Sequence, residues 1–322
     1  MKSKRIRCWL AALLGLPAVA WGQGEPAGDD AARAVDNTKP LPKTVKPPRT
    51  LEGGWTLEWN DEFNGTKLDT KKWNYELGVT RNKGCSQAYT KENVKVKDGV
   101  LKLISEARQT RNATHGKSGV APWAAAIKTQ PYASGSVTTR GTKSFSLPGR
   151  LEFRARIPKA KGVWPALWTM HQNGYGWPAN GEIDILEHIS QEPNTVYSIF
   201  RWGREGKKQH DAEKKVTRTT NIPDLSKEFH TYVLEWDRER MSIYIDDREV
   251  GSIRMEQAQY PNGDNPLLSP CYIIMNTAIG GPGTWPEKAD APGQYPVTFE
   301  IDYVRYYTKK EDANNTPEPR KK

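Results

Sequence analysis

Cysteine and histidine are scarce in this sequence, whose 322 residues include three cysteines and five histidines. They are scattered, and no CxxC, HExxH or similar set of spaced metal ligands occurs, so we expect no zinc site. A helical repeat is also missing, because no fifteen consecutive residues keep a period of 3.6. This excludes a TIM barrel, which needs eight amphipathic helices. The apolar runs are too short to span a bilayer, so we expect no transmembrane segment.

The start of the chain has the three parts of a secretory signal peptide. A basic stretch, MKSKRIR, is followed by the apolar run CWLAALLGL and by small residues, AVA, at 18–20. We predict a signal peptide over residues 1–20 and a secreted or periplasmic protein; the alternative is a buried N-terminal helix. Cys8 begins the apolar run, whereas a lipid-anchoring cysteine would end it. A disulfide is permitted outside the cytoplasm, but spacing does not say whether Cys85 and Cys271 pair.

Two segments have the composition of chain that does not pack into a core. Residues 21–50 are rich in Pro, Ala, Lys and Asp with few large apolar residues, and residues 309–322 have the same character. We predict a flexible linker and a disordered tail. Between them, residues 51–308 form a single body without an internal repeat.

The dominant period within this body is two. Apolar and polar residues alternate in KENVKVKDGVLKLISEA, GRLEFRARIP, FHTYVLEWDRERMSIYIDDREVGSI and VTFEIDYVRYY, between turns rich in glycine, proline, asparagine and aspartate. This pattern predicts antiparallel strands. About 250 residues of regularly spaced strands favour two packed sheets, a sandwich or jelly roll. The fold class is therefore all-β.

The stretch GEIDILEH places Glu182, Asp184 and Glu187 among isoleucine and leucine. Its β-branched residues favour a strand, in which Glu182 and Asp184 share a face while strict alternation sends Glu187 to the other. A β-bulge resolves this mismatch, because it lets two residues oppose one and switches the face of all later side chains. The adjacent Ile185 and Leu186 can both enter the core there. We therefore predict a bulge at Ile185 and Leu186, with the three carboxylates in one row.

Three neighbouring carboxylates repel one another unless they share protons. A retaining glycosidase uses such a group, because one ionised carboxylate attacks the anomeric carbon and another, kept protonated, donates its proton to the leaving oxygen. The alternative is a solvated acidic face of a strand without catalytic chemistry.

Tryptophans surround the carboxylates in the sequence and favour the first interpretation, because indole rings stack on the apolar faces of sugars. Trp164 and Trp168 share strand parity shortly before the acidic stretch. Trp177, Trp202 and Trp285 lie near turns or glycines, and we predict that they too line a saccharide cleft. The remaining tryptophans that lie in alternating strands are expected to fill the core; these are Trp55, Trp59, Trp73 and Trp236.

These residues also carry a family resemblance. GEIDILEH resembles the ExDxxE signature of glycoside hydrolase family 16, and further segments match in family order from about Trp55 to Tyr307: WTLEWNDEFNGTKLDTKKWNYE, QAYTKENVKVKDGVLKLISEAR, GRLEFRARIPKAKGVWPALWTM, FHTYVLEWDRERMSIYIDD, IIMNTAIGGPGTW and FEIDYVRYY. The resemblance implies a β-jelly roll of two curved sheets with a concave cleft. It also implies that Glu182 is the nucleophile, that Asp184 tunes it, and that Glu187 is the general acid/base.

The bulged spacing resembles the branch with laminarinases, agarases, carrageenases and endo-β-galactosidases. Laminarinases commonly carry NNELQYYT, where this chain has NKGCSQAYT with Cys85 at the glutamate position. They also often carry VHGTVH, where VYSIFR places Tyr197 and Arg201 at the two histidine positions. We therefore expect Arg201 to contact the substrate. The predicted function is a retaining endo-β-glycosidase cutting internal β-1,3 or β-1,4 bonds, leaning to a galactan-type glycan such as a mucin O-glycan, poly-N-acetyllactosamine or a sulfated galactan.

Several alternatives stay open at this point. One is a laminarin-type endo-β-1,3-glucanase, and another is a carbohydrate-binding relative that has lost the chemistry. The formal charge of +10 would suit an anionic glycan or describe a solvated surface of mixed charge. No recognised motif supports nucleic-acid binding. We expect a monomer.

Cofactors are not expected to take part in catalysis. The family resemblance implies a structural Ca²⁺ in many members, and Asp302 in FEIDYVRYY matches a residue near that site. The alternative for Asp302 is a charged residue on an exposed strand.

Overall fold

The computed structural model describes residues 36–203, 213–289 and 292–310. The predicted signal peptide and residues 311–322 of the predicted tail lie outside this part of the chain. Within it, the segments that alternate in sequence form β-strands, which pair almost entirely antiparallel. The all-β prediction is therefore confirmed.

The larger sheet has nine strands in the order β1-β2-β20-β11-β16-β17-β18, with β6 paired to β20 and β5 to β6. Its strands are β1 (Thr50–Leu51), β2 (Trp55–Asp61), β5 (Val94–Lys97), β6 (Val100–Ser105), β11 (Gly149–Arg156), β16 (His230–Trp236), β17 (Arg240–Ile245), β18 (Arg248–Arg254) and β20 (Val297–Thr308).

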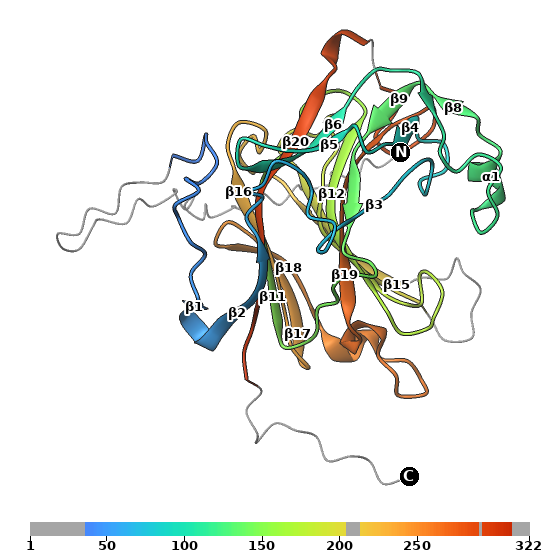
Figure 1. Ribbon diagram of the computed structural model, residues 1–322. Helices are drawn as coiled ribbons and strands as arrows, with labels where there is room; N and C mark the ends of the chain where they lie inside the picture. The colour runs from blue at the N-terminus through green and yellow to red at the C-terminus, as the bar shows by residue number, and fades with distance from the viewer. Residues whose placement is uncertain (1–35, 204–212, 290–291, 311–322) are drawn as a thin grey trace, which may run out of the picture. The chain divides into compact units, whose positions relative to one another are not determined.

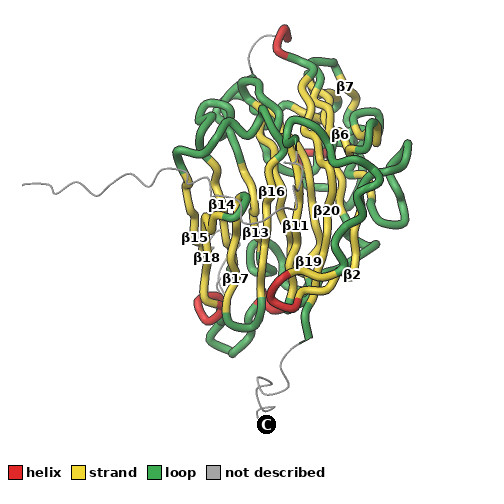
Figure 2. The backbone as a smooth tube through the Cα atoms, turned by 90° about the vertical axis from the view of Figure 1, so that its left-hand side faces the viewer, coloured by secondary structure: helices red, strands yellow, loops and turns green. Residues whose placement is uncertain are grey.

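The second sheet has seven strands in the order β15-β14-β13-β12-β19-β10-β3. These are β3 (Asn74–Tyr75), β10 (Ser136–Thr138), β12 (Val163–His171), β13 (Glu182–Glu187), β14 (Val196–Trp202), β15 (Glu213–Thr219) and β19 (Cys271–Ile279). Figure 1 shows strands of this sheet, among them β12, β19 and β15, in one layer and strands of the larger sheet, among them β11, β16 and β20, in the other. Figure 2, turned by 90°, looks onto the long strands of both layers.

Helices are short and peripheral. Small strand pairs and helical turns complete the described chain: β4 (Gln87–Tyr89) with β9 (Tyr132–Ser134), β7 (Thr110–Arg111) with β8 (Thr129–Gln130), α1 (Pro122–Ala125), and the 3-10 turns η1 (Glu52–Gly54), η2 (Met255–Ala258), η3 (Pro266–Leu268) and η4 (Pro292–Gln294). In the part of the chain that the structure describes, no helix has both the length and the apolar character needed to cross a membrane.

The hydrophobic core lies between the two sheets. Alternate residues of β11, such as Leu151 and Phe153, meet Ile183 of β13 and Phe200 of β14 there, and all four are fully buried. Of the tryptophans expected in the core, Trp73 and Trp236 are buried there, and Trp59 is partly buried and packs against it. Trp55 is buried outside this cluster, with Lys309 Nζ 4.7 Å from its ring.

Cys85 and Cys271 are both buried free thiols, which answers the question of their pairing for this structure. Burial raises the pKa of Cys85 to about 11 and the pKa of Cys271 to about 12. Both thiols are therefore protonated at neutral pH and serve as small apolar side chains rather than nucleophiles.

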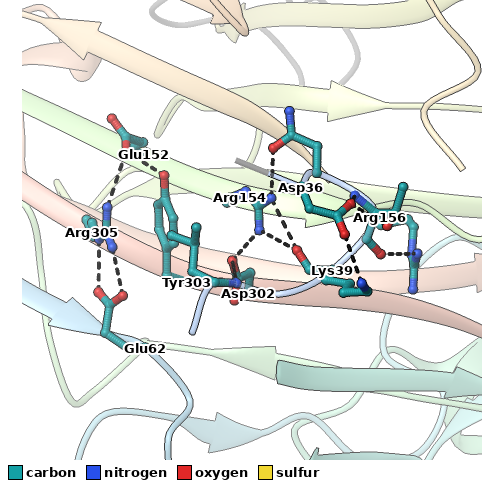
Figure 3. A network of polar contacts seen from close by, with 12 residues as sticks. Asp36, Lys39, Glu62, Glu152, Arg154, Arg156, Asp302, Tyr303 and Arg305 are labelled. Carbon is teal, nitrogen blue, oxygen red and sulfur yellow. Dashed lines mark hydrogen bonds and ion pairs between the residues drawn. The ribbon is translucent and has the colours of Figure 1, made fainter. Parts of the chain in front are cut away.

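Asp302 does not have the surroundings of a calcium ligand. Its buried carboxylate forms an ion pair with Arg154, and its Oδ2 accepts a hydrogen bond from the backbone N–H of Leu41 at 3.1 Å (Figure 3). Ca²⁺ takes about six to eight oxygen ligands, whereas here a guanidinium occupies the approach to the carboxylate. Among the described residues, no group of three or more His, Cys, Asp or Glu side chains could hold a metal ion. Asp302 is thus an ion-pair partner of Arg154 in this structure, and its role as a Ca²⁺ ligand stays a prediction.

The same arginine fixes the described end of the segment that we predicted to be a flexible linker. Arg154 lies on the face of β11 turned away from the core, and its Nη2 donates a hydrogen bond to Asn37 Oδ1 at 2.9 Å. Its guanidinium also donates to the backbone carbonyl of Lys39, and the N–H of Phe229 donates to the carbonyl of Asn37 at 2.7 Å. Residues 37–41 are therefore bound to the outer face of the nine-stranded sheet (Figure 3).

We expect Arg154→Met to lower the free energy of unfolding by about 3 kcal/mol or more, because it leaves the Asp302 carboxylate buried without its partner. Urea unfolding followed by tryptophan fluorescence measures the change. Lys159→Met is the matched control, since Lys159 pairs with Asp224 at the surface and should matter by less than about 1 kcal/mol. Equal effects of the two substitutions would contradict the role given to Arg154.

Candidate active site

The three carboxylates lie together on β13, near the centre of the seven-stranded sheet. Against β14, Asp184 pairs with Ile199 and Glu187 with Tyr197, so three steps along β13 match two along its neighbour. The pairing of β13 with its other neighbour, β12, also shifts by one residue at this point, because Leu167 pairs with Leu186 and the next residue, Trp168, pairs with Asp184. The predicted bulge at Ile185 and Leu186 is therefore confirmed. Both apolar residues are fully buried in the core, and all three carboxylates line one cavity on the opposite face of the sheet.

Glu182 is held from two sides. The Nε of Arg201 lies 2.9 Å from Glu182 Oε1 and forms an ion pair with it. The indole Nε1 of Trp177 donates a hydrogen bond to Glu182 Oε2 at 2.8 Å, and the Arg201 guanidinium lies 5.7 Å from the Trp177 ring. These contacts fix the direction of the Glu182 carboxylate.

Glu187, at the other end of the row, is buried beside aromatic rings. Trp164 donates from Nε1 to Glu187 Oε1 at 2.9 Å. The Trp164 ring packs edge-on against Trp285 at 5.2 Å, and Trp285 in turn packs edge-on against Tyr197 at 4.8 Å. Glu187 thus shares its end of the cavity with three aromatic side chains, which reduce its contact with water.

Asp184, in the middle of the row, is buried. Burial raises the pKa of Asp184 well above its usual range, and the negative charges of Glu182 and Glu187 raise it further, while Arg201 opposes the shift. A neutral aspartic acid can donate a hydrogen bond to a neighbouring carboxylate, which an ionised one cannot. The raised pKa of Asp184 therefore lessens the negative charge that the row carries.

The cavity has a volume of about 880 Å³ and crosses the face of the seven-stranded sheet that points away from the core. We call it the cleft. The residues that line it are Glu76, Val79, Thr80, Arg81, Asn82, Thr114, Gly119, Val120, Ala121, Arg140, Trp164, Ala166, Trp168, Met170, Trp177, Glu182, Asp184, Glu187, Tyr197, Ile199, Arg201, Val216, Tyr272, Ile274, Asn276 and Trp285.

Most of the predicted substrate-binding residues line this cleft. Trp177 and Trp285 expose about two fifths of their surface, 42% and 39%, as stacking platforms require. Trp164 and Trp168 also line the cleft but are less exposed. Trp168 donates a hydrogen bond from Nε1 to the side-chain oxygen of Asn276 at 2.8 Å. Arg201 reaches the cleft from β14.

Trp202 is the exception, and the prediction that it lines the cleft is wrong. Its side chain is 7% exposed and belongs to the core cluster between the sheets. The reason is the alternation of β14: Tyr197, Ile199 and Arg201 point to the cleft, so Phe200 and Trp202 point to the core.

A polar pair on the other side of the cleft was missed from the sequence. Arg81 donates from Nη1 to Glu76 Oε1 at 2.8 Å and from Nη2 to Ser136 Oγ at 3.0 Å. Burial alone would raise the pKa of Glu76, but the charge and hydrogen bonds of Arg81 outweigh it and lower the pKa. The guanidinium also lies 5.0 Å from the Trp168 ring. This pair can offer fixed hydrogen-bond partners to a sugar that contacts Trp168.

Comparison with known proteins agrees with this geometry. A family model for the glycosyl hydrolases family 16 matches residues 82–305. Glucan endo-1,3-beta-glucosidase of Cryptopygus antarcticus is 33% identical over 270 residues, covering 80% of this chain and 93% of that protein. Keratan-sulfate endo-1,4-beta-galactosidase of Sphingobacterium multivorum is 28% identical over 284 residues, covering 85% of this chain and 60% of that protein.

A solved structure is more similar in sequence than either of these. It comes from work on endo-acting O-glycanases, which prominent members of the human gut microbiota express to initiate mucin breakdown. It is 47% identical, has a TM-score of 0.77, and covers 83% of this chain and 96% of its own. The residues matched by the family model include the whole carboxylate strand and most of both sheets. The chain therefore belongs to glycosyl hydrolases family 16 and is a glycoside hydrolase with the β-jelly-roll fold.

Proposed function

We propose that this protein is a secreted or periplasmic, monomeric, retaining endo-β-glycosidase that cuts internal bonds of a galactan-type glycan. The observation that carries the catalytic part is the row of Glu182, Asp184 and Glu187, which the bulge gathers on one face within a cleft lined by tryptophans. An open cleft along a sheet suits a polymer bound along its length, which is what an endo-acting enzyme needs.

Glu182 is the nucleophile of the proposed mechanism. Arg201 and Trp177 fix the direction of its carboxylate, which attacks the anomeric carbon, displaces the leaving oxygen and forms a covalent glycosyl-enzyme intermediate. Glu187 first donates its proton to the departing glycosidic oxygen and then removes a proton from the water that releases the sugar from Glu182. Trp164, whose ring packs against Trp285, holds the Glu187 carboxyl in place through its Nε1 hydrogen bond.

Asp184 acts between these two residues as a proton-holding neighbour. The charges of Glu182 and Glu187 raise its pKa, so its protonated form lessens the repulsion within the row. As negative charge leaves Glu182 during attack, the pKa of Asp184 falls, because one of the two carboxylates that raise it has become neutral. Asp184 thereby tunes the nucleophile without contacting the leaving group.

Two observations support a galactan-type substrate. The similarity to the mucin O-glycanase structure is greater than that to the glucanase, at 47% against 33% identity. The chain also carries Tyr197 and Arg201 where laminarinases often have histidines, and these two side chains contact Trp285 and Glu182 beside the carboxylate row. They change the shape and charge of the cleft next to the catalytic residues.

A laminarin-type endo-β-1,3-glucanase is the second candidate, because the curated glucanase aligns over 93% of its own length. A carbohydrate-binding relative without chemistry is less well supported, since all three carboxylates are present and face the cleft. These alternatives predict different products.

We expect digestion of a glycan panel to give short oligosaccharides from mucin O-glycans, keratan sulfate or poly-N-acetyllactosamine, and little product from laminarin or mixed-linkage glucan. Product sizes are measured by chromatography with mass spectrometry. The Glu182→Gln variant is the blank for each glycan. Products from laminarin alone would make the protein a β-1,3-glucanase and reject the galactan proposal.

Glu182→Gln and Glu187→Gln should each lower kcat by about 10³-fold or more, because each removes a covalent or proton-transfer role. Glu256→Gln is the matched control, since Glu256 is exposed on η2 and should leave kcat within twofold. The control also reports any general effect of replacing a glutamate.

The two roles can be told apart with azide and an aryl glycoside. Glu187→Ala with azide should give a β-glycosyl azide, because the covalent intermediate still forms, and Glu182→Ala should give the α-azide by direct attack. The same anomer from both variants would contradict the assigned roles.

Asp184→Asn should raise the thermal midpoint more at pH 8 than at pH 5. The pKa of Asp184 is raised in the folded protein, whereas the unfolded chain releases this proton above about pH 4, so the free energy of unfolding falls as pH rises from there toward the folded-state pKa. Asparagine does not titrate and removes this loss. Scanning calorimetry measures the effect, and an equal shift at both pH values would show that Asp184 is ionised in the fold. Activity should fall less than in Glu182→Gln.

A further inference from the structure

The loop that precedes the carboxylate strand carries Trp177 to Glu182. Residues 172–181 join the end of β12 to the start of β13, and we call them the tryptophan loop. The hydrogen bond from the Trp177 indole to Glu182 Oε2 depends on where this loop holds the indole. Because the Trp177 side chain is itself exposed, its position depends on the backbone that carries it.

Tyr260, a residue outside the cleft, holds that backbone. Its hydroxyl donates a hydrogen bond to the backbone carbonyl of Ala179 at 2.7 Å, two residues after Trp177. The Tyr260 side chain is 4% exposed, belongs to the core cluster between the sheets and does not line the cleft. The core therefore fixes the ring of Tyr260, and its hydroxyl reaches the tryptophan loop from a fixed position.

The chain segment after Tyr260 binds the tryptophan loop at two further points. Tyr175 donates from its hydroxyl to Asp264 Oδ2 at 2.7 Å, and its ring packs edge-on against Tyr260 at 5.7 Å. Asn173 donates from Nδ2 to the backbone carbonyl of Pro266 at 3.2 Å. The two segments are thus joined by several contacts, of which the one at Ala179 lies nearest to Trp177 along the chain after it.

The tryptophan loop also lies against Gly203, just after β14. A Cβ atom at Gly203 would lie 2.5 Å from the Cα of Ala179, which is closer than such atoms approach one another. The backbone of Ala179 is therefore in close contact with two separate parts of the chain, a glycine and the Tyr260 hydroxyl. Such contacts leave Ala179 little freedom to shift.

We propose that Tyr260 is a positioning residue for the nucleophile: it fixes Ala179, and through the tryptophan loop it fixes the Trp177 indole that orients Glu182. Misplacing a reacting group by about 1 Å can cost about 10²-fold in rate, whereas stacking of a sugar on an exposed ring tolerates small shifts. This inference rests on the proposed function only in taking Glu182 as the nucleophile, and it holds for either candidate glycan.

The test replaces Tyr260 with phenylalanine, which keeps the ring and removes the hydroxyl. The probe is a dinitrophenyl β-glycoside of an N-acetyllactosamine-type or laminari-type disaccharide, according to the class that the glycan panel identifies. Dinitrophenolate departs without a proton, so kcat/KM reports attack by Glu182 rather than proton transfer by Glu187. We expect Tyr260→Phe to lower kcat/KM by about 10-fold. The affinity for the unlabelled disaccharide, measured by calorimetry, should stay within about 2-fold.

A double-mutant cycle shows whether Tyr260 acts through Trp177. Trp177→Phe removes the indole N–H that orients Glu182, so adding Tyr260→Phe to this variant should lower kcat/KM no further. Two residues that act independently would instead give losses that multiply.

Tyr306→Phe is the matched control. Tyr306 is also a buried tyrosine of the core cluster that does not line the cleft, and its hydroxyl donates to the backbone carbonyl of Ser146 at 2.6 Å. This variant should lower the thermal midpoint much as Tyr260→Phe does, because each loses one hydrogen bond to a carbonyl, but it should leave kcat/KM unchanged.

Three results would overturn the inference: an unchanged kcat/KM in Tyr260→Phe, an equal loss in Tyr306→Phe, or losses that multiply in the double variant. A different result rejects the proposed function itself. If Glu182→Gln cleaves the dinitrophenyl glycoside as fast as the wild type, Glu182 is not the nucleophile, and the inference about Tyr260 fails with that assignment.

Discussion

The bulge at Ile185 and Leu186 is the constraint on which the site depends. Burying an isoleucine or leucine side chain stabilises a fold by about 1.5–3 kcal/mol, and the bulge lets both neighbours reach the core at once. The change of face that follows turns Glu187 toward the cleft. The position of the carboxylate row is thus a consequence of core packing. Without the bulge, β13 would alternate strictly, and either one of the two apolar residues would be exposed or Glu187 would be buried in the core.

Gathering carboxylates in this way creates repulsion that the surroundings must offset. Arg201 pairs with Glu182, Arg81 pairs with Glu76 across the cleft, and the pKa of Asp184 is raised well above its usual range. The net charge of the cleft is consequently less negative than its carboxylates alone would make it. The formal charge of +10 therefore says little about the reacting centre, because charges elsewhere in the chain contribute most of it.

Strand parity explains what could be predicted from the sequence and what could not. The alternation of apolar and polar residues predicts the all-β fold and the bulge correctly. The same rule, applied to β14, shows that the neighbouring residues Arg201 and Trp202 cannot both face the cleft. Contacts between distant segments were not accessible to it: Arg81 meets Ser136 from 55 residues away. Likewise, only the folded structure shows that Arg154 forms an ion pair with the carboxylate of Asp302.

Strand β14 carries side chains for two purposes on its two faces. Its cleft-facing positions, Tyr197, Ile199 and Arg201, each lie beside the carboxylate strand β13, while its core-facing positions anchor the sheet. Exchanges at Tyr197 or Ile199 can alter which sugar is accepted without moving β13 or its bulge, whereas Arg201 also holds Glu182. Relatives with the same carboxylate row can thus acquire new substrates through one or two substitutions on a single neighbouring strand.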